Sequence, residues 1–145
     1  MIDAINRGQK VINYTGHGNT SQWRGSILTS EDAAALSNGS RLSLFVSMTC
    51  LNGYFQDAAA DSLAEALLKA ERGGAVAVWT SSGLTEPSAQ ALLDQEMFRL
   101  LFGSGLLKSQ SLTLGEAATR AKSSISSVDV RRTWILLGDP SMKLK

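Results

Sequence analysis

Cysteine, histidine and proline are scarce in this chain of 145 residues, which has one Cys, one His and two Pro. A single Cys excludes a disulfide within the chain and leaves the redox compartment open. One Cys and one His are too few for a zinc site without several carboxylates, so no metal is expected. No cofactor is predicted, because the glycine loops match neither the P-loop pattern nor the G-x-G-x-x-G pattern of dinucleotide-binding proteins.

An excess of one charge and long apolar runs are missing as well. Fourteen Lys and Arg residues stand against thirteen Asp and Glu residues, and the net charge is +1. The basic residues form no stripe, so nucleic acid is not an expected partner. The apolar runs are too short to span a membrane. A hydrophobic content of 43% and this length are typical of one folded globular domain.

Short apolar segments alternate with amphipathic ones along the chain. Strands are expected at 10–15, 42–48, 75–80 and 133–137, which are rich in β-branched or aromatic residues and mostly apolar on both faces. Strands of this kind are typical of a parallel sheet covered on both sides. Residues 1–10 resemble the end of a helix that leads into a strand, so we expect the chain to begin inside a larger domain.

Helices are expected between these strands, at 30–37, 61–72, 86–102 and 113–126. Their apolar residues recur with the helical period, and polar capping residues precede each of them. The expected caps are Thr29 with Asp32, Asp61 or Ser62, Thr85 with Pro87 following, and Thr113 with Glu116. The alternation of strands and helices predicts a layered α/β domain with right-handed crossovers.

The unique His and Cys occupy equivalent places in this pattern. His17 follows the first predicted strand and Cys50 follows the second. The other two strands end in Thr80-Ser81-Ser82-Gly83 and in Gly138-Asp139-Pro140. Ligands of open α/β sheets bind outside the carboxyl ends of the strands. Parallel strands would therefore bring His17 and Cys50 to one edge of the sheet.

Chemistry gives a reason for this pairing. A thiol is nucleophilic as the thiolate, and a nearby imidazole favours the thiolate and then protonates a leaving amine. Glycines on both sides of His17 allow close approach of the backbone to a substrate. The N–H groups of Gly18 and Cys50 are candidate donors to an oxyanion.

Simpler interpretations exist for each residue alone. A single Cys after a buried strand is often a small core residue, and a single His in a glycine loop is often only a hydrogen-bonded loop residue. Asn52-Gly53 is typical of a turn. The equivalent strand-end positions of His17 and Cys50 favour the Cys–His interpretation.

Several segments resemble the gingipain-type cysteine peptidases, family C25 of the caspase-like clan. The resemblance runs from about Lys10 to Lys145, in the family's order. Its motifs are YTGHGN, VSMTCLNGYF, SLAEALLKA, GGAVAVWTSS and TWILLGDPSMKL. It implies a caspase-like three-layer α/β/α fold with a mainly parallel sheet.

The resemblance also implies a mechanism. Cys50 would attack the scissile carbonyl and form an acyl-enzyme, His17 would act as general acid and base, and the N–H groups of Gly18 and Cys50 would hold the oxyanion. A protein or peptide would be the substrate, and the parent protein would be secreted or on the cell surface. The residues expected by position in the substrate pocket are Thr15, Met48, Thr80, Ser81 and Ser82, with the segment up to Thr85.

The chain departs from the family pattern at its start. Caspase-like sheets usually have six strands with two before the histidine strand, whereas nine residues precede that strand here. The upstream acids that assist the histidine and select Arg in gingipains have no position in this chain. The aromatic residue that gingipains carry on the loop after the third strand has no counterpart either, because 83–88 contains no Trp. An inactive caspase-like interaction module and a CHAT-like relative are the alternatives to an endopeptidase. The exposed strand 10–15 predicts a homo-oligomer or association with the missing N-terminal segment.

Overall fold

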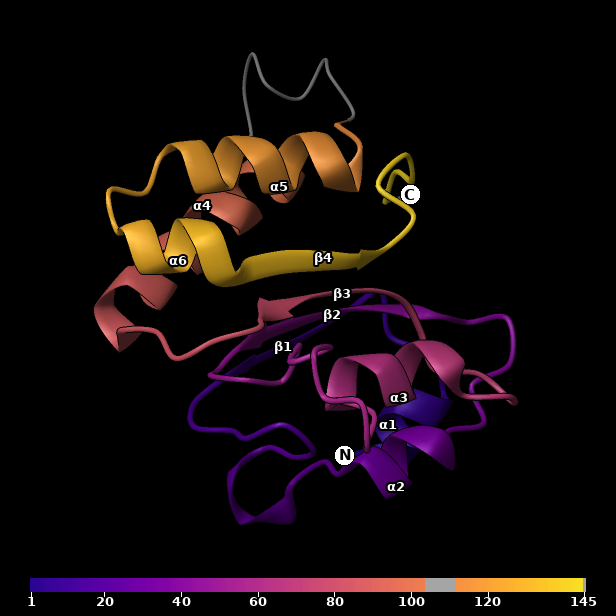
Figure 1. Cartoon of the computed structure of the whole chain (residues 1–145). Coiled ribbons are helices and arrows are strands. Elements are labelled where there is room, and N and C mark those ends of the chain that lie inside the picture. Colours follow the sequence, from indigo (N-terminus) through magenta and orange to yellow (C-terminus); the bar gives the residue numbers. More distant parts are fainter. Residues whose placement is uncertain (104–111, 145) are drawn as a thin grey trace.

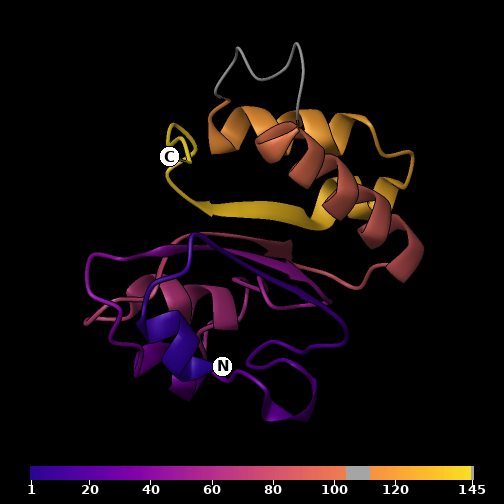
Figure 2. The ribbon, with the colours of Figure 1, turned by 180° about the vertical axis from the view of Figure 1, so that it is seen from behind.

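The structure, a computed structural model, describes residues 1–103 and 112–144. Its helices lie in two layers on either side of one sheet, and Figure 2 shows the same layers from behind (Figures 1 and 2). Within the described residues, none of the helices is long and apolar enough to cross a membrane. One layer holds α1 (Ile2–Asn6), α2 (Ser30–Ala34) and α3 (Leu63–Lys69), the other α4 (Pro87–Phe102), α5 (Leu114–Ser123) and α6 (Val128–Thr133).

The sheet has the order β1-β2-β3-β4. β1 (Val11–Thr15), β2 (Ser43–Met48) and β3 (Ala75–Ser81) are parallel, as predicted, and β2 lies between the other two. β4 (Trp134–Gly138) runs antiparallel to β3. The three-layer, mainly parallel α/β/α fold is therefore confirmed.

The antiparallel β4 corrects one sequence expectation. Trp134 pairs with Ser81 at the carboxyl end of β3, so β4 starts where the other strands end. Gly138-Asp139-Pro140 consequently lies at the opposite end of the sheet, and Asp139 is not an acid near His17 and Cys50. α6 leads directly into β4 from that end, which is why the strand runs back.

Element boundaries differ from expectation mainly at helix ends. The segments 30–37, 61–72 and 113–126 end earlier as α2, α3 and α5, and α6 is a helix that the sequence pattern did not predict. Thr85 is not a cap, because α4 is preceded by Glu86 and begins at Pro87. The capping boxes that form are Thr29 with Asp32, Ser62 with Glu65 and Thr113 with Glu116.

β2 is the centre of the core, and each of its residues is buried. Leu44, Val46 and Met48 pack into the cluster under α4 and α5, while Phe45 packs on the α2 and α3 side. Successive side chains of a strand point to opposite faces, so the two helical layers together enclose this strand. The site at its carboxyl end therefore stands on a rigid support.

β1 forms one edge of the sheet. Its ladder with β2 begins at Lys10 and continues to Gly16. Alternate residues of a strand in a parallel ladder bond to the same neighbour. Val11, Asn13 and Thr15 therefore direct their backbone N–H and C=O groups away from β2.

α4 covers part of this edge. The Asn13 amide donates to both carboxylate oxygens of Asp94, at 3.3 and 3.1 Å. Burial raises the pKa of Asp94, and the hydrogen bond from Asn13 opposes the rise. The side chains of Val11, Ile12 and Tyr14 are half-buried, so what the edge leaves open is mainly backbone.

The buried side-chain amide of Asn38 lies at the end of the sheet where β2 and β3 begin, opposite the carboxyl ends of β1 to β3. Asn38 is fully buried, and its Nδ2 donates to the carbonyls of Arg41 and Gly74 at 2.8 and 2.9 Å. Its Oδ1 accepts from the Gly74 N–H at 2.7 Å. Gly73 approaches this amide too closely to allow a Cβ, and Gly74 has a φ of +97°.

Replacing Asn38 with Ala should lower the free energy of unfolding by about 2–3 kcal/mol, because three backbone groups lose their buried partner. Urea denaturation measures this loss. Asn13→Ala is the matched control, since its exposed bond to Asp94 is expected to contribute about 0.5 kcal/mol or less. Equal losses in the two variants would contradict this role for Asn38.

Candidate active site

The register of β1 and β2 brings two loops together. The loop that follows β1 carries His17 (the His loop), and the loop that follows β2 carries Cys50 (the Cys loop). Thr15 pairs with Met48, and the Gly16 N–H donates to the Met48 carbonyl at 3.1 Å. His17 and Cys50 each lie two residues beyond this pair. Both residues therefore follow neighbouring strands at the same end of the sheet.

Two donors hold the backbone of His17. Its carbonyl accepts from the Tyr14 hydroxyl at 3.0 Å and from the Arg24 N–H at 2.8 Å. Tyr14 stacks on the buried Trp23, with ring centroids 4.2 Å apart and planes 9° apart. The loop is therefore anchored from two sides, while His17 itself is exposed.

Gly18 presses the His loop against the Cys loop. A Cβ at this position would lie 2.9 Å from Thr49 Oγ1 and 3.1 Å from Asn52 Nδ2, so a side chain does not fit without movement. Within the described residues, neither the Gly18 N–H nor the Cys50 N–H donates to a protein acceptor. Their role as donors to an oxyanion stays a prediction.

Asn52 joins the two loops from below. It is buried, its Oδ1 accepts from Thr49 Oγ1 at 2.8 Å, and its Nδ2 donates to the Asn19 and Gln22 carbonyls at 2.6 and 3.4 Å. The sequence indicated only a turn at Asn52-Gly53. The sequence signal that could have indicated a structural role for the Asn52 amide was the position of Asn52 between the unique Cys and a glycine.

The Cys50 thiol is half-buried under the loop that follows β3. Its Sγ donates to the Thr85 carbonyl at 3.7 Å, and Thr85 also accepts from the buried Gln90 amide. The next residue, Leu51, has a φ of +64°, a conformation that costs a non-glycine residue free energy and often marks a functional turn. Its N–H donates to the Gly83 carbonyl at 3.2 Å.

Three residues expected in the substrate pocket lie in the interior. Met48 belongs to the core cluster, Thr80 Oγ1 donates to the Ser47 carbonyl, and Ser81 Oγ donates to the Gly83 carbonyl. Their side chains are fully buried, so they do not reach an open surface. Their part in a substrate pocket stays a prediction. Thr15 is exposed and Ser82 is half-buried.

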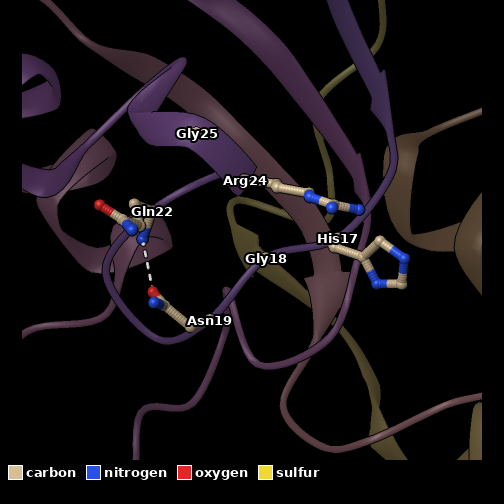
Figure 3. Close-up of a pocket in the computed structure, with 6 residues that line it drawn as sticks. All are labelled: His17, Gly18, Asn19, Gln22, Arg24 and Gly25. Atoms are coloured by element: carbon tan, nitrogen blue, oxygen red, sulfur yellow. Dashed lines mark hydrogen bonds between the residues drawn. The ribbon is translucent and has the colours of Figure 1, made fainter.

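The cavity at this end of the sheet lies beside His17 (Figure 3). It has a volume of about 410 Å³, and neither Cys50 nor the predicted pocket residues line it. No group of three or more His, Cys, Asp or Glu side chains among residues 1–103 and 112–144 is arranged to hold a metal ion. The residues around the cavity are His17, Gly18, Asn19, Gln22, Arg24 and Gly25.

Replacing Asn52 with Ala should lower the free energy of unfolding by about 2–3 kcal/mol, because the buried groups that it pairs lose their partner. The His loop should loosen at the same time. Hydrogen exchange measures this as reduced protection of the Asn19 and Arg24 amides, whose bonds close the loop. Asn13→Ala should leave both amides protected. Unchanged protection in Asn52→Ala would show that the loop does not depend on Asn52.

Comparison with known proteins agrees with this architecture. The sequence profile of peptidase family C25 matches residues 1–145. Gingipain R2 and gingipain R1 of Porphyromonas gingivalis are each 35% identical to this chain over 74 residues, which make up 51% of the chain. These residues cover 10% of gingipain R2 and 7% of gingipain R1.

Solved structures extend the likeness to the whole fold. The crystal structure of the Arg-specific cysteine proteinase gingipain R matches 99% of the chain with a TM-score of 0.86 and 26% identity. A complex of the gingipain pro- and mature domains matches 99% with a TM-score of 0.86 and 25% identity. The chain covers 35% and 36% of those two chains, about a third of their length. The protein belongs to peptidase family C25, a family of cysteine peptidases, and has the caspase-like fold of the gingipains.

Proposed function

We propose that this chain provides the Cys–His pair of a cysteine endopeptidase, with Cys50 as nucleophile and His17 as general acid and base. The observation that carries the proposal is the β1–β2 register, which sets the two residues at equivalent positions beyond Thr15 and Met48. A protein or peptide is the substrate. The secreted or cell-surface location that the resemblance implies stays a prediction.

The reaction begins with loss of the Cys50 thiol proton to His17. The thiolate attacks the scissile carbonyl carbon, and a C–S bond forms as the carbonyl oxygen becomes an oxyanion. The N–H groups of Gly18 and Cys50, which have no protein acceptor within the described residues, donate to that oxyanion. His17 then gives its proton to the leaving amine, and the C–N bond breaks to leave the acyl-enzyme.

Water completes the cycle. It loses a proton to His17 as its oxygen attacks the thioester carbon, and the C–S bond breaks to release the acid. The proton returns to the thiolate. His17 is suited to both steps because its side chain is exposed while two hydrogen bonds fix its backbone.

The thiol must turn before it attacks. Cys50 Sγ donates to the Thr85 carbonyl, and it makes no hydrogen bond to His17. A distance of 3.7 Å to a carbonyl is a weak bond for a thiol, so a bound substrate displaces it at little cost. Thr15 and Ser82 are the surface residues for the acyl side of the substrate, with Met48, Thr80 and Ser81 supporting them from the interior.

Replacing Cys50 with Ala in the full-length protein should reduce peptide cleavage by about 10³-fold or more, roughly 4 kcal/mol of barrier, because the acyl-enzyme route is lost. Since Cys50 is the only Cys of the chain, alkylation by iodoacetamide within it reports on this thiol alone. His17→Ala should slow cleavage and alkylation at neutral pH, with alkylation restored at raised pH where the thiolate forms unaided.

Gln56→Ala is the control, since Gln56 is exposed in the same loop as Cys50. It should keep full cleavage and labelling. Full cleavage by a folded Cys50→Ala protein would refute the proposed nucleophile. A Cys50 that is alkylated at the rate of a free thiol, without cleavage of any peptide, would instead favour the interaction module.

The open edge of β1 supports a second part of the proposal, which concerns association. The outward N–H and C=O groups of Val11, Asn13 and Thr15 have no strand beside them among the described residues. The edge carries no Pro, and its only charge, Lys10, precedes it. We therefore expect the edge to pair with a second copy or with an N-terminal segment.

The chain of 145 residues alone should elute as an oligomer at micromolar concentration when light scattering follows size-exclusion chromatography. Asn13→Pro removes an outward N–H without touching the ladder to β2, so it should shift the population toward monomer. Asn13→Ala keeps that N–H and loses only the bond to Asp94, so it should stay associated. A monodisperse wild-type monomer with β1 solvated would contradict edge pairing.

A further inference from the structure

We propose that the cavity beside His17 is the subsite for a carboxylate on the leaving-group side of the substrate, and that Arg24 is its charge partner. The inference rests on the proposed function of His17 and Cys50. It adds the specificity of that site, namely a preference for an acidic residue after the cleaved bond.

The position of the cavity fixes the side of the substrate. His17 is part of its wall and Cys50 is not. The acyl group stays on the Cys50 sulfur, whereas the leaving amine takes its proton from the imidazole. Residues after the cleaved bond therefore lie over His17, next to this cavity.

The lining is suited to a carboxylate. Arg24 is the one Lys or Arg among the lining residues, Asn19 and Gln22 contribute amides, and the residues that remain besides His17 are glycines. A guanidinium offers paired N–H donors that match the two oxygens of a carboxylate. No Asp or Glu is among the lining residues to compete for it.

The guanidinium of Arg24 is uncommitted in the described part of the chain. It makes no ion pair and no side-chain hydrogen bond there. By contrast, Arg41 donates to the Asn6 carbonyl, and Arg99 is paired with Glu96. A charge that holds no structural contact is available to a ligand.

The loop that carries Arg24 is well fixed. The backbone N–H of Arg24 donates to the His17 carbonyl, and the preceding Trp23 is buried against Tyr14. Gly25, with a φ of +73°, turns the chain directly after it. Figure 3 shows the side chains of Arg24 and His17 extending to the same side of this loop. The backbone of Arg24 is thus held near the proposed path of the leaving group, and its side chain extends toward that path from a fixed point.

Two sources of a carboxylate would suit this chemistry: an Asp or Glu side chain after the cleaved bond, and the free carboxylate at a peptide's C-terminus. We favour the side chain, because the proposed endopeptidase cleaves within a chain, which continues past the residue that follows the cut. Synthetic substrates with free and amidated C-termini distinguish the two.

The test is cleavage of a peptide library by the full-length protein, read by mass spectrometry, because a library offers every residue type before the cut. Asp and Glu should be enriched about two- to fivefold in the first three positions after the cut, the range for an exposed ion pair. Arg24→Gln should remove the enrichment, and Arg24→Glu should replace it with enrichment of Lys and Arg. High salt should weaken the wild-type preference.

Arg7→Gln is the matched control, because Arg7 is exposed at the end of α1 and lines no part of the cavity. It should keep the wild-type profile. Cleavage with the same acidic enrichment in wild type and Arg24→Gln would overturn this inference and leave the proposed function standing. Loss of cleavage on amidation would assign the site to the C-terminal carboxylate and overturn the side-chain preference. Absence of any cleavage and of Cys50 labelling would overturn both proposals.

Discussion

The register between β1 and β2 is the constraint on which the candidate site depends. β2 is buried on both faces, with Phe45 toward one helical layer and Val46 toward the other. A slip of one residue would exchange those faces and bury the wrong side chains. The packing of the core therefore also sets which residue of the His loop lies opposite Cys50, and the chemistry at the strand ends follows from burial in the middle of the sheet.

The loops that extend this register are joined by polar groups in the interior. The Asn52 amide would be costly to bury without partners, but Thr49 and two carbonyls of the His loop pair with it. Gly18 brings the same loops into direct contact because it has no Cβ. The hydrogen bonds of Asn52 and the close packing at Gly18 thus act at the same place. Together they fix the position of the His loop relative to Cys50.

The sequence was sufficient for the parts of the fold that depend on local patterns. Apolar runs marked the strands, and Thr29, Ser62 and Thr113 marked helix starts. The direction of β4 was not readable, because an apolar strand has the same pattern in either direction. The burial of Met48, Thr80 and Ser81 was missed for a related reason: whether a strand end faces solvent depends on the loop that covers it. The sequence did not single out Arg24, because a loop arginine has no periodic signal.

The two sides of the candidate site differ in how firmly they are held. On the Cys50 side, the Thr85 carbonyl accepts from the thiol over a long distance, and the buried Gln90 fixes that carbonyl. On the His17 side, Tyr14 and Arg24 hold the backbone with shorter bonds. The weak contact is thus the one that involves the proposed nucleophile, and the firm contacts hold the backbone of the proposed base. In the proposed reaction, a substrate that displaces the thiol from Thr85 breaks only this weak contact, while the backbone of His17 keeps its hydrogen bonds to Tyr14 and Arg24. The backbone of the candidate site is therefore held in place before a substrate binds, and in the proposed reaction the thiol is the group that has to move.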